Sequence, residues 1–381
     1  VLQRVLPERM SNGDDNPVSY QLRNNYPFTI TAALIDELPQ QFQLRRFCLH
    51  TLLKAGEEKE LRQLLRPVER GNYEFGVTHL YVKSRLGLAE RRFTFGEEES
   101  IPVYPAFIQL RKYQLVAEAA ALAETGNKRI RKMGHSMEFE QIRDYVQGDD
   151  VRTINWKATA RKGALMVNAY TDEKSQPVYC IIDKGRLMKM PFNGLTLLDH
   201  AINASLVVGS VALHKQDRFG LLTFDHQGGS SLVADRKPVQ LEKVLQVLYN
   251  QQTSFLESDF EQLYARVRTL VRQRSLLVLF TNFESVQGLR RQLPYLKRLS
   301  TFHLLLVVFF ENTELRAKAD APVNDMESLY IKTIAGKFVH EKELIAKELQ
   351  QAGIICVLTP PEQVTIQTIN KYIEIKNRQL L

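Results

Sequence analysis

The stretch Pro177-Val178-Tyr179-Cys180-Ile181-Ile182-Asp183 decides the fold of the C-terminal half, because it is apolar throughout and ends in a carboxylate. A strand that is hydrophobic on both faces is typical of a parallel sheet covered on each side by helices. Further apolar runs predict strands at 218–225, 275–282, 302–310 and 354–358. Helical periodicity separates them at 195–213, 239–249, 258–272, 289–299, 326–350 and from Pro361 onward. We therefore expect a doubly wound, mostly parallel α/β domain over residues 175–381.

The first part of the chain, residues 1–106, has a different pattern, in which apolar and polar residues alternate over short segments. Val18–Leu22, Phe28–Ala32 and Val77–Val82 are examples, and turn residues separate such segments. Alternation indicates strands with one buried and one solvated face. We expect an immunoglobulin-like β-sandwich here. Residues 107–174 then supply a helix and a polar segment that link the two domains, which makes the protein multidomain.

Length and composition limit the classes of function. With 381 residues, of which 44% are hydrophobic and 25% charged, the chain is not largely disordered. Lysine and arginine number 51 against 43 acidic residues, and this net charge of +8 suits an acidic partner or an anionic membrane surface but requires neither. Cys48, Cys180 and Cys356 form no C-x-x-C pair, so we expect reduced thiols in a cytosolic compartment. The longest wholly apolar run, 304–310, is too short to cross a bilayer.

Polar side chains follow the predicted strands of the sheet, notably Asp183 and Asn282. Ligands bind beyond the carboxyl ends of the strands in such sheets. A magnesium ion there could take one oxygen from Asp183 and a hydroxyl from Thr253 or Ser254. The residues directly after Asp183 add no oxygen donor and include two cations, which disfavours a metal site. The alternative is that Asp183 caps the following helix or pairs with one of those cations.

Catalytic motifs are missing from the sequence, which has no Gly-x-Ser-x-Gly elbow and no His-Glu-x-x-His. A basic cluster is formed by Lys128, Arg129, Arg131 and Lys132. It stands without a helix-turn-helix, zinc-finger or aromatic RNA-binding signature, so we expect a solvated loop, which anionic lipid would attract, rather than a nucleic-acid site. The sequence therefore favours a protein that is not an enzyme and does not bind nucleic acid.

The most distinctive segment reads Glu138-Phe139-x-x-Ile142-Arg143-Asp144-Tyr145-x-x-Gly148-Asp149-Asp150-x-Arg152-x-Ile154-Asn155-Trp156-Lys157-Ala158-Thr159-Ala160-Arg161. Charges of both signs surround the only tryptophan of the chain. One interpretation is an internal ion-pair network that pins the segment across the two domains, with Trp156 as a buried anchor. The other is a docking surface, because Trp and Arg are favoured in binding hot spots. The residues concerned are Arg143, Asp144, Asp149, Asp150, Arg152, Trp156, Lys157 and Arg161.

This segment closely resembles the signature of the family called domain of unknown function 58. The resemblance extends to Asp36-Glu37-Leu38-Pro39, Arg70-Gly71-x-Tyr73-x-Phe75-Gly76, Leu86-Gly87-Leu88, Leu165-Met166-Val167 and Gln176-Pro177-Val178-Tyr179. It implies a von Willebrand factor A-like domain, in which a metal ion is often held by an Asp-x-Ser-x-Ser loop, a Thr and a further Asp. Asp183 matches the first Asp and Thr253 the Thr. Gly185 and Leu187 stand in place of the serines and Asn282 in place of the last Asp, so the resemblance implies a degenerate site.

The resemblance also implies a setting for the protein. Family members commonly carry a short membrane hairpin before the β domain and lie beside genes for MoxR-type AAA+ ATPases. A hairpin before Val1 would anchor this chain, itself soluble, to the cytosolic face of the inner membrane. We expect a non-enzymatic scaffold or adaptor that needs no cofactor and binds a MoxR-type ATPase or its client. The alternative is an adhesion module that depends on Mg²⁺ or Mn²⁺.

Overall fold

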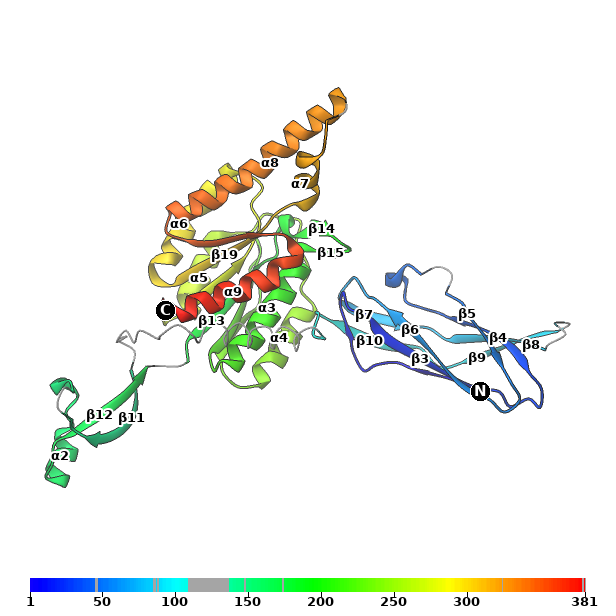
Figure 1. Cartoon of the computed structure of the whole chain (residues 1–381), viewed down its shortest axis with the longest axis horizontal. Helices are drawn as coiled ribbons and strands as arrows, with labels where there is room; N and C mark the ends of the chain where they lie inside the picture. The colour runs from blue at the N-terminus through cyan, green and yellow to red at the C-terminus, as the bar shows by residue number, and fades with distance from the viewer. Residues whose placement is uncertain are drawn as a thin grey trace.

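The computed structural model describes residues 1–44, 47–84, 87, 89–108, 137–146, 149–172, 175–323, 325–378 and 380. It has a strand-rich N-terminal region, a strand hairpin and a C-terminal α/β region (Figure 1). The helix predicted to follow Phe107, most of the residues linking the two domains and the basic cluster at 128–132 lie outside the described residues. The boundaries expected at 106 and 174 stay a prediction.

The N-terminal region consists of small, mostly antiparallel sheets around one core. β3 (Asn16–Arg23) lies between β1 (Leu2–Val5) and β6 (Glu58–Leu65). The order of the second sheet is β5 (Leu49–Leu53), β4 (Ile30–Asp36), β8 (Thr78–Ser84) and β9 (Glu90–Phe95), and a short helix η1 (Gln40–Phe42) precedes β5. β10 (Glu99–Tyr104) pairs with β7 (Gly71–Phe75) and, in parallel, with β2 (Met10–Ser11). Their inward side chains share one hydrophobic cluster, which confirms the predicted alternation.

The C-terminal sheet has six strands in the order β17-β16-β13-β18-β19-β20. β13 (Pro177–Asp183), β16 (Arg218–Phe224), β18 (Leu276–Phe280), β19 (Leu304–Phe310) and β20 (Ile355–Thr359) are parallel, as predicted. The edge strand β17 (Ser231–Asp235) is antiparallel and was not predicted. It follows a turn at Gly228-Gly229, where the positive φ of 118° and 154° favours glycine.

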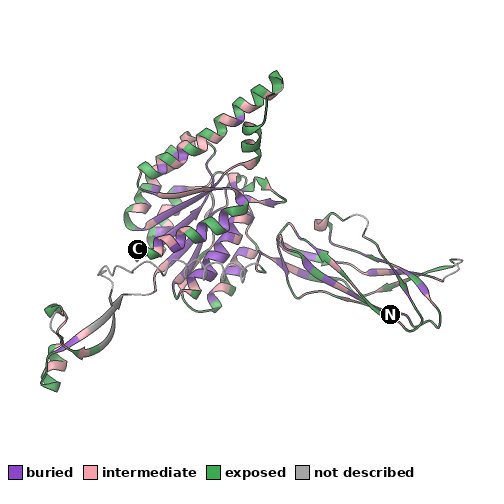
Figure 2. Ribbon diagram, viewed as in Figure 1, coloured by how far each residue is buried: buried purple, intermediate pink, exposed green. Residues whose placement is uncertain are grey.

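Helices cover both faces of this sheet (Figures 1 and 2). One hydrophobic cluster contains α3 (Leu197–His214), α4 (Val239–Tyr249) and α9 (Val364–Asn377), and the other contains α5 (Phe260–Leu270), α6 (Val286–Phe302) and α8 (Met326–Gln351). Cys180 and Ile182 point into the first cluster, and Tyr179 and Ile181 into the second. β13 is therefore apolar throughout because both of its faces are buried. The shorter elements are η3 (Arg186–Lys189), β14 (Pro191–Phe192), β15 (Leu195–Thr196), α7 (Thr313–Asp320) and η4 (Pro361–Gln363).

The core helix α3 is long and apolar enough, by length and composition, to cross a membrane. However, 78% of it is buried inside the protein, where it packs against β13 and β16. Its apolar residues are thus accounted for by the core of the α/β region. Among the described residues it is the one helix with this composition.

Arg70 joins the N-terminal region to the α/β region. Its Nε donates to Asp199 at 2.7 Å, and its two terminal nitrogens donate to the carbonyl oxygens of Leu248 at 2.6 Å and Gln251 at 2.7 Å. The Arg70–Asp199 ion pair is almost completely buried. The N–H of Ala106 adds a hydrogen bond of 2.9 Å to the side chain of Asn203. A planar guanidinium with five donors suits such a junction, because it satisfies several acceptors at once.

The signature segment folds as an antiparallel hairpin of β11 (Met137–Asp144) and β12 (Met166–Asp172). Between the two strands the chain forms η2 (Val151–Thr153) and α2 (Trp156–Lys162). Asn155 caps α2 by accepting a hydrogen bond from the N–H of Ala158, and Gly163 ends the helix in the left-handed conformation. The irregular composition of this segment therefore corresponds to several short elements.

Candidate functional site

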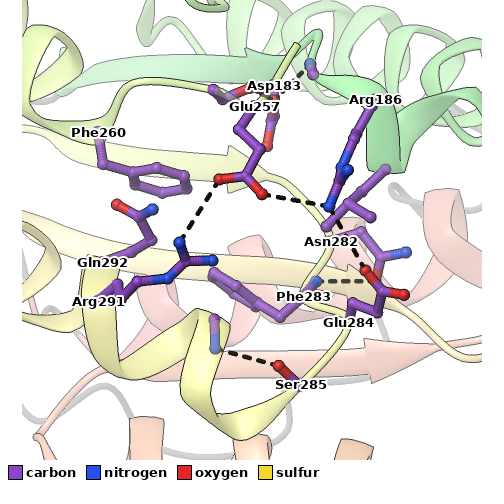
Figure 3. Close-up of a pocket in the computed structure, with 14 residues that line it drawn as sticks. Asp183, Arg186, Glu257, Phe260, Asn282, Phe283, Glu284, Ser285, Arg291 and Gln292 are labelled. Carbon is purple, nitrogen blue, oxygen red and sulfur yellow. Dashed lines mark hydrogen bonds and ion pairs between the residues drawn. The ribbon is translucent and has the colours of Figure 1, made fainter. Parts of the chain in front are cut away.

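A pocket opens beyond the carboxyl ends of β13 and β18 (Figure 3). These two strands are adjacent, and the chain continues from β13 to β16 on one side and from β18 to β19 on the other. In open α/β sheets this switch point is where ligands bind. The residues that line the pocket include Asp183, Arg186, Glu257, Ser258, Asn282 and Arg291.

Asp183 lies at the base of the pocket and is only 4% exposed. Its Oδ1 accepts hydrogen bonds from the N–H of Gly185 at 2.8 Å and from the hydroxyl of Ser258. Its Oδ2 accepts a hydrogen bond from the hydroxyl of Thr281 at 2.6 Å. Burial raises the pKa of Asp183, and these hydrogen bonds partly offset that shift. Protein donors thus occupy both oxygens of the carboxylate.

The hydroxyl groups that contact Asp183 are those of Ser258 and Thr281, and not those of the predicted residues, Thr253 or Ser254. Among the described residues that line the pocket, Ser258 is present and Thr253 is not. Ser254, the other predicted donor, bonds to the carbonyl oxygen of Lys184. Ser258 directly precedes Asp259, the N-cap of α5, and Thr281 directly follows β18. Hydroxyl residues at those two places were a signal that the sequence interpretation missed.

Gly185 has no room for the serine that its position would carry in a metal-binding loop. A Cβ at residue 185 would lie 2.3 Å from the Ser258 hydroxyl oxygen and 3.2 Å from the Ser258 backbone nitrogen. The first contact requires the Ser258 hydroxyl to turn away from Asp183, and the second requires the Ser258 backbone to shift slightly. The glycine is therefore part of the packing that brings Ser258 onto Asp183.

Asn282 is bound by a lysine from a distant helix. Lys342 of α8 donates from Nζ to the Asn282 Oδ1 at 2.5 Å and to the carbonyl oxygen of Phe283 at 2.5 Å. Burial lowers the pKa of Lys342 to about 8. In a metal site, the amide oxygen of Asn282 would have to replace the last carboxylate. That oxygen already accepts a hydrogen bond from the Lys342 ammonium group.

The cations that follow Asp183 pair with other carboxylates. Lys184 forms a largely buried ion pair of 3.1 Å with Asp225. Arg186 pairs with Glu257 at 3.2 Å. The expectation that Asp183 pairs with one of these cations is wrong, because its own oxygens are taken by uncharged donors. The expectation that it caps the next helix is also wrong, since η3 has no side-chain cap.

These residues do not fit a divalent metal ion. Magnesium requires several oxygen ligands in octahedral geometry. Asp183 is the buried carboxylate of the pocket, and its oxygens already accept hydrogen bonds from Gly185, Ser258 and Thr281. The other two carboxylates of the lining, Glu257 and Glu284, lie beside arginine side chains. Across the described part of the chain, no three His, Cys, Asp or Glu side chains are grouped to hold a metal.

The rim of the pocket is charged and partly apolar. Glu257 lies between Arg186 and Arg291, at 3.2 and 3.8 Å, and Arg186 also approaches Glu284 at 4.0 Å (Figure 3). Phe255, just before these residues in the chain, is 75% exposed. Its ring lies 3.6 Å from the Lys189 ammonium, a cation–π contact. Arginine and aromatic side chains exposed together are typical of protein-binding surfaces.

Trp156 is not the buried anchor that one interpretation required. It is the first residue of α2 and is 69% exposed. Lys157 and Arg161 of the same helix are exposed as well. The helix α2 has seven residues and packs mainly against β12. It therefore has no deep core in which Trp156 could be buried.

The charged residues of the signature pair within the hairpin. Arg143 binds Asp149 through two hydrogen bonds of 2.8 and 2.6 Å, and this arginine lowers the pKa of Asp149. Lys162 pairs with Asp144 at 2.9 Å. Asp150 caps η2 by accepting a hydrogen bond of 3.0 Å from the N–H of Arg152. Among the described residues these contacts stay within the hairpin, so the expectation of a network that pins the segment across the two domains is wrong.

Residues 141–336 match the family model described as "Protein of unknown function DUF58". The uncharacterized protein YeaD of Bacillus subtilis (strain 168) is 28% identical over 178 residues, which are 45% of this chain and 44% of that protein. The chain therefore spans less than half the length of this curated relative. Neither description names an enzymatic activity.

Two solved structures resemble a limited part of the chain. The PapD-like domain 7 of human CEP192 is 11% identical, covers 27% of this chain and 84% of its own, and has a TM-score of 0.21. SSP-19, a protein of Caenorhabditis elegans similar to MSP-domain proteins, is 8% identical, covers 25% and 94%, and has a TM-score of 0.19. Scores this low carry no argument about fold or function.

Proposed function

This chain belongs to the family described as protein of unknown function DUF58, and we propose that it is a non-enzymatic scaffold that binds a protein partner without a metal ion. In this proposal the α/β region is von Willebrand factor A-like and the N-terminal region is an immunoglobulin-like sandwich. The observation that carries the proposal is that both oxygens of the buried Asp183 carboxylate accept hydrogen bonds from the protein, from Gly185, Ser258 and Thr281. An incoming cation would have to displace these donors.

The rim of the pocket is the surface we propose for docking. Phe255 and its neighbour Leu256 are both more than half exposed. Burying two such side chains against a partner is favourable by about 1.5–3 kcal/mol each. Arg186 and Arg291 share Glu257 and are themselves partly exposed, so they can exchange that carboxylate for one on a partner. This combination of apolar and arginine side chains supports binding of an acidic polypeptide segment.

The exposed hairpin offers a second contact. Trp156, Val151 and Val146 are each at least 60% exposed. A tryptophan exposed to this extent contributes little to the stability of its own domain. Because tryptophan is favoured in binding hot spots, we propose that Trp156 contacts the partner.

The identity of the partner and its setting follow from the family resemblance. We propose a MoxR-type AAA+ ATPase or its client as the partner. We also propose that a segment outside this chain anchors it to the cytosolic face of the inner membrane. A metal-dependent adhesion module remains the alternative function, and a titration with Mg²⁺ separates it from the present proposal.

Capture of the ATPase from native membranes tests the proposal. We expect the wild-type chain to enrich the ATPase or its client in EDTA as well as in Mg²⁺. The paired variant Phe255→Ser with Arg291→Glu should lose at least about tenfold of that enrichment, because it removes an apolar contact and reverses a charge. Trp156→Ala should lose less. Leu52→Ser is the matched control, because Leu52 is an exposed leucine on β5, far from the pocket in sequence.

Two results would count against this function. Capture that requires Mg²⁺ would favour the adhesion module. Equal enrichment by the wild type and by the Phe255→Ser, Arg291→Glu variant, with circular dichroism showing both to be folded, would remove the pocket rim as the docking surface.

A further inference from the structure

Positive charge is concentrated on the helix pair α5 and α6. Between Glu261 and Glu311 the sequence contains eight arginine and lysine residues but only one acidic residue, Glu284. The two helices lie side by side on one face of the sheet (Figure 1). Because the net charge of the whole chain is +8, most of its excess positive charge lies in this part of the molecule.

Two contacts define how the helices align. The hydroxyl of Tyr295 donates to Glu261 at 3.1 Å, and the guanidinium of Arg298 lies 6.0 Å from the centre of the Tyr264 ring. In both contacts the α6 residue lies 34 positions after its α5 partner, so the two helices run in the same direction. Continuing this alignment sets Arg268 of α5 level with the last residue of α6.

Three arginines lie along the seam between these helices, and we call Arg291, Arg298 and Arg268 the arginine stripe. Arg291 and Arg298 are seven residues apart on α6 and therefore share one face of it. Arg268 reaches the same seam from α5, where one of its terminal nitrogens donates to the hydroxyl of Tyr264 at 3.5 Å. All three arginines are exposed, and Arg291 also belongs to the rim of the pocket. The stripe therefore runs from the pocket rim along the seam for about 16 Å, at 1.5 Å per helical residue.

Few carboxylates balance the stripe. Among the described residues, Arg268 and Arg298 form no ion pair, and Arg291 approaches Glu257 at 3.8 Å. Glu261, an acidic residue of the seam, accepts its hydrogen bond from a tyrosine hydroxyl. The guanidinium groups of the stripe are therefore available to an anion from outside the chain.

The aromatic side chains of the seam are already engaged. Tyr264 contacts both Arg268 and Arg298, and Tyr295 binds Glu261. Proteins that bind single-stranded nucleic acids use aromatic side chains that are free to stack on the bases. The tyrosines here instead orient guanidinium groups, which lowers the entropy lost when a ligand orders them.

The apolar faces of both helices are buried in the core of the α/β region. Leu263 and Val267 of α5 and Leu289 and Leu296 of α6 belong to that core. A helix that binds a lipid surface inserts its apolar face among the lipids. Phe302, at the end of α6, is a single exposed apolar side chain and needs no special explanation. The stripe therefore suits an anionic chain better than a bilayer.

We propose that the arginine stripe binds an acidic, extended segment of the partner polypeptide, which continues from the rim of the pocket. This inference rests on the proposed function, because the stripe shares Arg291 with the docking rim. An extended chain advances about 3.3 Å per residue, so about five residues span the stripe. The steps along the stripe, about 10 Å from Arg291 to Arg298 and about 6 Å on to Arg268, are within reach of the long side chains of glutamates on such a segment. Each carboxylate that meets a guanidinium adds a charge-assisted hydrogen bond.

Fluorescence anisotropy of the whole chain with a labelled peptide of twelve alternating glutamate and serine residues tests the inference. The wild type should bind this peptide saturably, and added salt should weaken the binding. Arg268→Glu with Arg298→Glu should raise the dissociation constant at least about tenfold. Arg268→Gln with Arg298→Gln, which removes the charges without adding new ones, should raise it at least about threefold.

Arg91→Glu with Arg92→Glu is the matched control, because it makes the same change in net charge on two exposed arginines of β9. It should bind the peptide within about threefold of the wild type. Circular dichroism should show all the variants to be folded, since the substituted side chains are exposed. Equal affinities of the wild type and both stripe variants would overturn the inference. Tighter binding of the wild type to phosphatidylglycerol vesicles or to oligothymidylate than to the peptide, lost in the stripe variants, would overturn it as well.

Failure of this inference is distinguishable from failure of the proposed function. If the wild type and the Arg268→Glu, Arg298→Glu variant capture the ATPase equally and the peptide does not bind, the stripe is wrong and the docking rim stands. If the peptide binds through the stripe and capture of the ATPase or its client fails, the proposed partner is wrong and the stripe stands.

Discussion

The pocket beyond β13 and the signature hairpin both contain charged residues that the sequence singled out, but they use them in opposite ways. In the pocket, Asp183 is buried and bound by groups from three separate parts of the chain, at Gly185, Ser258 and Thr281. In the hairpin, Arg143 and Asp149 pair within a few residues of each other and stay partly exposed. The residue that looks most like a ligand-binding group is thus held structurally, and the most distinctive segment of sequence is at the surface.

This difference has an energetic side. Removing one partner from a buried hydrogen-bond network lowers the free energy of unfolding by about 1–3 kcal/mol, because the remaining polar group then has no hydrogen-bond partner from either the protein or the solvent. A surface ion pair contributes about 0–1 kcal/mol. We therefore expect changes in the pocket to affect folding, and changes in the hairpin to affect binding with little effect on folding.

The largest expected effect comes from restoring the missing serine, Gly185→Ser. Its side chain would collide with Ser258, whose oxygen lies 2.3 Å from the position of the new Cβ. We expect the free energy of unfolding in urea to fall by about 2–3 kcal/mol. Gly288→Ser is the control in the same pocket, because its nearest neighbour is at 3.5 Å. If both variants were equally stable, Ser258 would not be packed as described.

Lys342→Met should change the dependence of stability on pH. Burial lowers the pKa of Lys342 from 10.5 to about 8, so between these values the unfolded chain binds more protons than the folded one. The free energy of unfolding of the wild type should therefore rise with pH in this window, by about 1–2 kcal/mol more than that of the variant. Lys347→Met, on an exposed part of the same helix, should keep the slope of the wild type. Parallel curves for Lys342→Met and the wild type would contradict the burial of this ammonium group.

Asp183→Asn should weaken the dependence of stability on pH, because it removes the buried charge. Burial raises the pKa of Asp183, so the folded state binds more protons above the unfolded value of 3.8, and the stability of the wild type falls as pH rises through that range. The amide nitrogen of the variant cannot accept a hydrogen bond as the carboxylate oxygen does, so the variant should be less stable than the wild type near pH 4, and this difference should shrink as the pH is raised towards 7. Asp225→Asn provides the contrast, since it breaks the ion pair with Lys184 and should destabilise. Urea unfolding at several pH values checks both, and a stability difference between Asp183→Asn and the wild type that grows as the pH rises would contradict this description.

The smallest effect is expected for Trp156→Ala, which should alter the free energy of unfolding by less than about 0.5 kcal/mol. Because this is the only tryptophan, its fluorescence in the wild type reports the hairpin directly. Acrylamide should quench it nearly as strongly in the native protein as in urea. Strong protection from quenching in the native protein would instead restore the buried-anchor interpretation.

The sequence was sufficient for the parts of the fold that depend on local patterns. The continuous apolar run of β13 predicted a strand buried on both faces, and the alternation around Val18 and Tyr20 predicted a strand with one buried face. β17 and α7 were missed, because five or eight residues with little periodicity give a weak signal. The position of Asp183 at the carboxyl end of a buried strand was predicted correctly.

The partners of Asp183 could not be predicted in the same way. Ser258 and Thr281 lie 75 and 98 residues further along the chain, and they reach Asp183 only because β18 and the start of α5 converge at the switch point. Lys342 reaches Asn282 across 60 residues from a different layer of the fold. The burial of Trp156 was also misjudged, because aromatic residues are usually buried and the sequence does not reveal how little surrounds α2.

Calorimetric titration of the whole chain with Mg²⁺ and then Mn²⁺ is the most direct test of the central claim, that the pocket at Asp183 is closed to cations by the protein's own donors. We predict no saturable heat with either ion up to millimolar concentrations, and the same flat titration for Asp183→Ala. Saturable binding of one ion per chain by the wild type, lost in Asp183→Ala, would contradict the claim.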